Sequence, residues 1–97
     1  MTFRRAARVD ANQPEIVDAF RKMGCSVAIV SQLKKLCDLF VSKNKKTAAI
    51  EIKDGSLPKS KRQLTEGEMD FMHSWKGLYF IVESLDDVAR VVKELEA

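Results

Sequence analysis

The sequence has few of the residues that mark several classes of protein. Its 97 residues include two cysteines, two prolines and one histidine, and they contain no repeat or low-complexity segment. No apolar run approaches the roughly 20 residues that a membrane-spanning helix needs, and the opening residues lack the apolar core of a signal peptide. We therefore expect a cytoplasmic protein with no membrane partner.

The scarce cysteine, histidine and aromatic side chains fit structural roles better than chemical ones. Cys25 and Cys37 have no spacing typical of metal ligands, so we interpret both as reduced core residues rather than a disulfide. His73 lies beside Trp75 on a predicted helix, where a partly buried neighbour is a commoner role than a catalytic base. Trp75 and Tyr79 have the spacing of core residues, the alternative being stacking on nucleic-acid bases.

What the chain does contain is typical of one small globular domain. Apolar residues make up 45% and charged residues 32% of it. We expect a single domain over residues 1–97, near the lower size limit for independent folding. A partner subunit would help such a chain to bury apolar surface.

The net charge of +3 is unevenly distributed along the chain. Residues 34–62 hold nine basic and three acidic side chains, whereas residues 64–97 hold three basic and eight acidic ones. The basic middle segment suits a polyanion such as nucleic acid. A solvated, lysine-rich surface explains the same pattern equally well.

Hydrophobic periodicity and turn residues predict an α/β fold in the order helix, three strands, helix, strand, helix. Asn12 is the expected N-cap of the first helix, and Thr65 with Glu68 has the spacing of a capping box before the second. The predicted helices span 11–24, 66–76 and 85–96, the strands span 25–30, 37–42, 47–53 and 78–83, and a loop spans 54–63.

Two acids and a lysine form the main candidate site. A short turn joins the predicted strands 37–42 and 47–53, so a hairpin brings Asp38 and Glu51 to the same end of the sheet. Two carboxylates there suit Mg²⁺ or Mn²⁺. Lys53 is two residues past Glu51, hence on the same side of the strand, where it can orient a water or neutralise a phosphate.

Each of these acids also has a plainer interpretation. Asp38 and Glu51 could be surface acids paired across the hairpin with its lysines. Glu15, in the first predicted helix, could approach the same strand ends and add a ligand. An acid in a first helical turn is equally explained by the helix dipole.

At this point the residues resemble a known family. The stretches "CDLFV" and "IEIKDG" resemble the motif of PD-(D/E)xK nucleases, in which an acid in one strand precedes acid-x-lysine in the next. The longer stretches "RRAARVDANQPEIVDAFRKMG", "KDGSLPKSKRQLTEGEMDF" and "YFIVESLDD" resemble small stand-alone VRR-NUC-like nucleases of phages and prophages. Two positions depart from the pattern: Cys37 replaces the proline, and Met69 replaces an expected glutamine.

The resemblance implies a fold and a chemistry. The fold would be restriction-endonuclease-like, with an αβββαβ core and a C-terminal helix. Asp38 and Glu51 would bind Mg²⁺, for which Mn²⁺ can substitute, together with the backbone carbonyl of Ile52. Lys53 would be the catalytic lysine, and Glu15 the acid that completes the metal site. Such an enzyme would hydrolyse DNA phosphodiesters in the host cytoplasm, with branched DNA as substrate and a homodimer as the working form.

Two basic segments are the expected DNA contacts. The loop after Lys53 could grip the phosphate backbone, and so could an N-terminal basic arm, whose plainer interpretation is a solvated terminus. The candidate DNA-binding residues are Lys59, Lys61, Arg62 and Gln63 in the loop, and Arg4 and Arg5, followed by Arg8, in the arm.

Two other functions remain open from the sequence. A protein of nuclease fold could bind DNA within a larger complex without cutting it. Alternatively, the acidic helix predicted over 85–96 could bind a protein partner.

Overall fold

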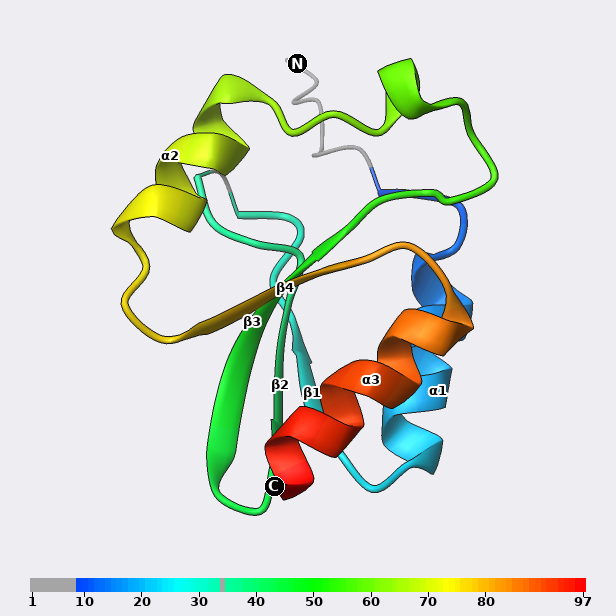
Figure 1. Cartoon of the computed structure of the whole chain (residues 1–97), viewed down its shortest axis with the longest axis vertical. Helices are drawn as coiled ribbons and strands as arrows, with labels where there is room; N and C mark the ends of the chain where they lie inside the picture. The colour runs from blue at the N-terminus through cyan, green and yellow to red at the C-terminus, as the bar shows by residue number, and fades with distance from the viewer. Residues whose placement is uncertain (1–8, 34) are drawn as a thin grey trace, which may run out of the picture.

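A four-stranded mixed sheet with helices on both faces makes up the molecule (Figure 1). The computed structural model describes residues 9–33 and 35–97. This α/β architecture, with its C-terminal helix, agrees with the predicted αβββαβ order. The elements are α1 (Gln13–Lys22), β1 (Ser26–Ile29), β2 (Leu39–Lys43), β3 (Lys46–Ile52), the short 3₁₀ helix η1 (Lys59–Lys61), α2 (Glu66–Ser74), β4 (Leu78–Val82) and α3 (Leu85–Glu96).

The strands lie in the order β1-β2-β3-β4, antiparallel except for the parallel pair β3 and β4. Asn44 and Lys45, with φ of 57° and 64°, form the two-residue turn between β2 and β3. Positive φ at both central residues is typical of the hairpin turn whose twist matches that of the strands. The turn fixes the register of the hairpin, in which Leu39 pairs with Ile50.

The main core lies between one face of the sheet and the helices α1 and α3, which lie side by side in Figure 1. Apolar residues at helical spacing on α1 and α3 meet alternate residues of the strands, as the sequence predicted. The fully buried members include Ile16, Phe20, Leu39, Ile50 and Leu95. Cys25 and Cys37 are also buried and unpaired, so their interpretation as reduced core residues is confirmed.

The opposite face of the sheet carries α2 (Figure 1). Aromatic rings join the two: Trp75, which ends α2, lies 5.6 Å from Phe40, and Phe71 lies 6.1 Å from Tyr79, between ring centroids. The capping box predicted for α2 is present, because the side chains of Thr65 and Glu68 each accept the other's backbone N–H. The first turn of α2 is therefore capped by its own side chains.

Asn12 precedes α1, as predicted, but its side chain does not cap the helix. Its Nδ2 instead donates hydrogen bonds to the backbone carbonyls of Lys53, at 3.1 Å, and Glu83, at 3.5 Å. Asn12 thus ties the start of α1 to the chain just beyond β3 and β4. Within the described part of the chain, each helix is too short or too polar to cross a lipid bilayer.

Candidate functional site

The hairpin of β2 and β3 brings Asp38 and Glu51 together at one end of the sheet. Asp38 lies one residue before β2, and its N–H donates to the Ile50 carbonyl at 3.0 Å, so pairing continues past the strand. The Asp38 carboxylate accepts a hydrogen bond of 2.8 Å from the backbone N–H of Ile52. The side chain of Glu51 lies close to that of Asp38, and both line the same hollow. The predicted convergence of these two acids is present.

Glu51 is an acid in an unusual environment. It is only 3% exposed, and its carboxyl group lies close to those of Asp38 and Glu68, with which it lines one hollow. Burial raises the pKa of Glu51 far above its ordinary value, and the nearby negative charge of Asp38 adds to the effect. Burial and the neighbouring carboxylate therefore both favour the protonated form of Glu51.

Lys53 lies just past β3 and reaches the same cluster. Its Nζ is 2.7 Å from Oε1 of Glu68, and its side chain is 12% exposed. Burial acts to raise the pKa of Glu68, but the hydrogen bonds from Lys53 and from the Thr65 backbone outweigh it and lower that pKa. Glu68 is therefore a carboxylate that links the acid pair to the lysine.

From the sequence, Glu68 is expected only as a member of the capping box. The box does predict that the glutamate side chain turns back over the first turn of its helix. That this turn faces Lys53 depends on how α2 packs on the sheet, which local spacing does not reveal.

Asp10 is a second acid that the sequence analysis did not single out. Burial raises its pKa, with the nearby charge of Asp38 adding to the rise and that of Lys53 opposing it. These influences indicate that Asp10, which precedes α1, lies within electrostatic range of the site. No local motif distinguishes it from any other acid before a helix.

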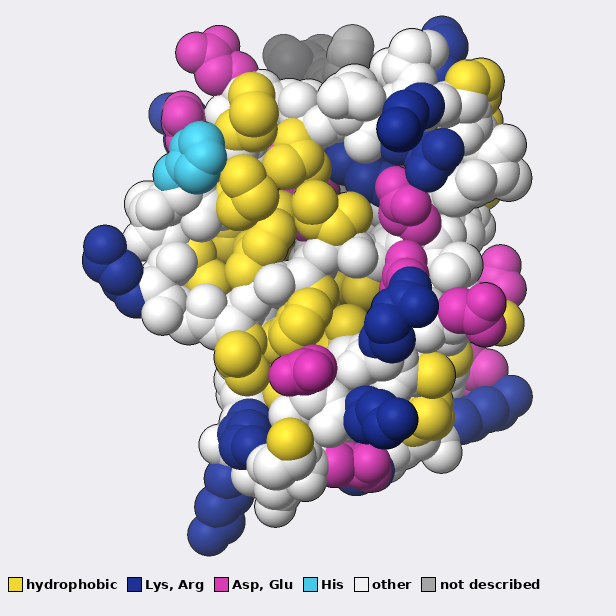
Figure 2. Space-filling model, viewed as in Figure 1, with side chains coloured by type: hydrophobic (Ala, Val, Ile, Leu, Met, Phe, Trp, Pro, Cys, Tyr) yellow, Lys and Arg dark blue, Asp and Glu magenta, His cyan; other side chains and the backbone are white. Residues whose placement is uncertain are grey.

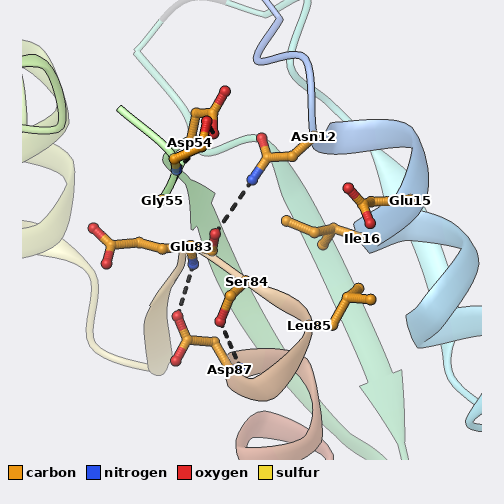
Figure 3. Close-up of a pocket in the computed structure, with 10 residues that line it drawn as sticks. Asn12, Glu15, Ile16, Asp54, Gly55, Glu83, Ser84, Leu85 and Asp87 are labelled. Carbon is orange, nitrogen blue, oxygen red and sulfur yellow. Dashed lines mark hydrogen bonds between the residues drawn. The ribbon is translucent and has the colours of Figure 1, made fainter. Parts of the chain in front are cut away.

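Glu15 does not join the acid pair, so the expectation that it approaches Asp38 and Glu51 is corrected. It is exposed on α1 and lines a different hollow, with Asn12, Asp54, Glu83 and others (Figure 3). The apolar residues of α1 that follow it must face the core. That requirement sets the rotation of the helix and leaves Glu15 at this second hollow.

The two hollows differ in their chemistry. The one that Asp38, Glu51 and Glu68 line has a volume of about 310 Å³, and Thr65 at the start of α2 is among its other lining residues. The second, about 510 Å³, is larger and is lined by Glu15, Asp54, Glu83 and Asp87 at the start of α3. Size alone favours the second hollow, but the first contains the buried carboxyl group and adjoins the lysine.

The residues predicted to contact DNA differ in whether their side chains already have partners within the protein. Lys59 and Lys61 are exposed on η1, in a part of the surface where basic and acidic side chains lie close together (Figure 2). Arg62 forms an ion pair of 3.1 Å with Glu83 and also donates to the Leu57 carbonyl. Gln63 donates to the carbonyl of Lys59. The arm residues Arg4, Arg5 and Arg8 lie outside the described residues.

Asp38 and Glu51 are the two side chains at this site that could hold a hard divalent cation. In the described ranges, no group of three or more His, Cys, Asp or Glu side chains is arranged to hold a metal ion. Mg²⁺ needs fewer, because it usually keeps several waters and binds through one or two carboxylates. Asp38 and Glu51 supply two carboxyl groups in contact, one of them buried, and the charge of a cation there would offset their repulsion.

Comparison of the chain with models of known families, with curated proteins and with solved structures found no match. The resemblance to PD-(D/E)xK nucleases therefore stays a prediction.

Proposed function

We propose that this protein is a Mg²⁺-dependent deoxyribonuclease that hydrolyses phosphodiester bonds. The observation that supports this most is the gathering of Asp38, Glu51 and Lys53 at one end of the hairpin. There Glu51 lies close to Asp38 and Glu68 in one hollow, and Lys53 forms an ion pair with Glu68. Two acids and a lysine on neighbouring strand ends are the groups that metal-assisted hydrolysis of a phosphodiester requires.

In this proposal Asp38 and Glu51 hold the ion, with the backbone carbonyl of Ile52 as a further ligand. When bound, Mg²⁺ lowers the pKa of a coordinated water and stabilises negative charge on the phosphate. The N–H of Ile52 keeps the Asp38 carboxylate oriented, and Glu51 gives up its proton on binding. Lys53 directs its ammonium toward the scissile phosphate or the attacking water.

DNA would approach from the side of the loop that follows β3. Lys59 and Lys61 are free to contact phosphates there, whereas Arg62 contributes less because Glu83 already holds it. A preference for branched DNA and a homodimeric working form complete the proposal. The preference for branched DNA derives from the resemblance alone, whereas a homodimer would also help a chain of 97 residues to bury apolar surface.

The test is nicking of supercoiled plasmid by the full chain with Mg²⁺, with Mn²⁺ and with a chelator. We expect cleavage with either ion, none with the chelator, and loss of cleavage in Lys53→Ala. Lys45→Ala is the matched control, since Lys45 is an exposed lysine at the far end of the same hairpin. DNA binding without metal-dependent cleavage would instead favour a non-cleaving DNA-binding module. A panel of linear, single-stranded, flap and four-way-junction DNA then tests the preference for branches.

A further inference from the structure

Glu68 makes more contacts than a capping residue needs. Its Oε1 accepts the backbone N–H of Thr65 at 2.8 Å and the Lys53 ammonium at 2.7 Å. Its carboxyl group also lies close to that of Glu51 in the same hollow. We infer that Glu68 is a positioning residue that holds the Lys53 ammonium beside the acid pair. This inference rests on the proposed nuclease function and adds a residue to its machinery.

The capping box makes Glu68 a rigid anchor. Oγ1 of Thr65 accepts the Glu68 N–H at 3.2 Å, and Oε1 of Glu68 accepts the Thr65 N–H in return. These bonds fix the glutamate at the first turn of α2 before any contact with Lys53 is counted. Lysine, by contrast, carries its charge on a flexible four-carbon stem, so it needs a fixed partner to define where the ammonium lies.

The position of Glu68 matters because other acids lie close enough to attract the Lys53 ammonium. The charges of Lys53 and Asp38 both act on Asp10, so alternative partners for the ammonium are within electrostatic range. Among the described residues, however, the ion pair that Lys53 forms is with Glu68. Holding the ammonium there keeps it from neutralising Asp38 and Glu51, the groups that would bind the metal. Glu68 thereby leaves Asp38 and Glu51 available to the metal while Lys53 stays nearby.

Two variants separate positioning from capping. Glu68→Gln keeps the box, because glutamine serves at this position of a capping box as well as glutamate does, but it removes the negative charge that holds Lys53. Thr65→Ala weakens the box and leaves the glutamate charge in place. A purely structural role for Glu68 predicts that Thr65→Ala is the more damaging change, and a positioning role predicts the reverse.

The first readout does not depend on activity. The metal-free full chain is treated briefly with acetic anhydride, and mass spectrometry compares acetylation of Lys53 with that of Lys45, an exposed internal reference. We expect Lys53 to react at least about threefold faster in Glu68→Gln than in the parent, because its ammonium is no longer paired, and to change little in Thr65→Ala. Equal labelling of Lys53 in the parent and in Glu68→Gln overturns the inference.

The second readout is steady-state cleavage with Mg²⁺. We expect Glu68→Gln to lower kcat about 10- to 100-fold, the usual effect of losing a partner that orients an active-site group, with KM for DNA nearly unchanged. An unchanged kcat contradicts the positioning role. If the parent does not cut DNA at all, the proposed function fails, while the labelling result still decides whether Glu68 holds Lys53.

Discussion

The backbone N–H of Ile52 donates a 2.8 Å hydrogen bond to Oδ2 of Asp38, across the end of the hairpin. This bond orients a carboxylate from one strand by the backbone of the next. The side chain of Glu51, which precedes Ile52, lies against that carboxylate. The pairing of the two strands therefore brings the two acids close together.

Asp38→Asn should abolish metal binding without unfolding the protein. The asparagine Oδ1 can still accept the Ile52 N–H, so the local structure is retained, but the ligand charge is lost. We expect affinity for Mn²⁺, measured by titration calorimetry, to fall more than about 100-fold, since even residues outside the ligand set cost about 10- to 100-fold. Asp18→Asn, at an exposed acid paired with Lys22 on α1, should leave the affinity unchanged. Equal losses in both variants would contradict the assignment.

Glu51 should make the metal-free protein less stable as pH rises. Its pKa is raised in the folded state, so the folded protein binds a proton that the unfolded chain releases. That contribution to stability is fully present below the unfolded pKa of about 4.3 and is lost progressively as pH rises toward the folded value. Urea unfolding of Glu51→Gln between about pH 5 and pH 9 should show a flatter dependence than the parent. Glu66→Gln, at an exposed acid in α2, is the control, and its free energy of unfolding should depend on pH as that of the parent does. If Glu51→Gln also showed the same pH dependence as the parent, the raised pKa of Glu51 would be contradicted.

Asn12 should contribute to stability through its two long-range hydrogen bonds rather than through helix capping. Asn12→Ala removes the donor to the Lys53 and Glu83 carbonyls, and we expect a loss of about 1–3 kcal/mol in the free energy of unfolding. Gln32→Ala, at an exposed position, provides the baseline. A loss no larger than that of the control would mean that the two contacts contribute nothing.

Two glycines should respond in opposite directions to alanine. A Cβ at Gly55 would lie 2.7 Å from the carbonyl oxygen of Glu83, so Gly55→Ala must separate the chain after β3 from the end of β4 and should destabilise the protein. A Cβ at Gly67, in the first turn of α2, meets nothing within 4 Å, and alanine costs less backbone entropy in a helix than glycine does. Gly67→Ala should therefore stabilise by about 0.5–1 kcal/mol, measured by urea unfolding. If both substitutions stabilised the protein, the close approach of Gly55 to the Glu83 carbonyl would be contradicted.

DNA affinity should depend on salt partly through η1. If Lys59 and Lys61 each contact a phosphate, the slope of log K against log salt should fall by roughly 2 in the variant that carries Lys59→Ala and Lys61→Ala. Fluorescence anisotropy with labelled duplex and a chelator measures binding without cleavage. Lys93→Ala, on α3, should leave the slope unchanged. An unchanged slope in the double variant would remove η1 from the DNA-binding surface.

The order of the elements and the acid pair were predictable because they depend on local patterns. The turn at Asn44 and Lys45 sets the hairpin register, and the alternation along β3 sets which side chains share a face with Glu51. The contacts of Glu68 and Asp10 depend instead on how α2 and the start of α1 pack on the sheet. Glu15 lies away from the acid pair for a related reason, since the apolar stripe of α1 sets the rotation of the helix. Sequence spacing carries little information about such packing.

Anomalous diffraction from crystals grown with Mn²⁺ tests the central claim most directly. The account predicts a peak that contacts the carboxylates of both Asp38 and Glu51. A peak in the larger hollow beside Glu15, Asp54 and Glu83 instead, or no peak at Asp38 and Glu51 under saturating Mn²⁺, would contradict it.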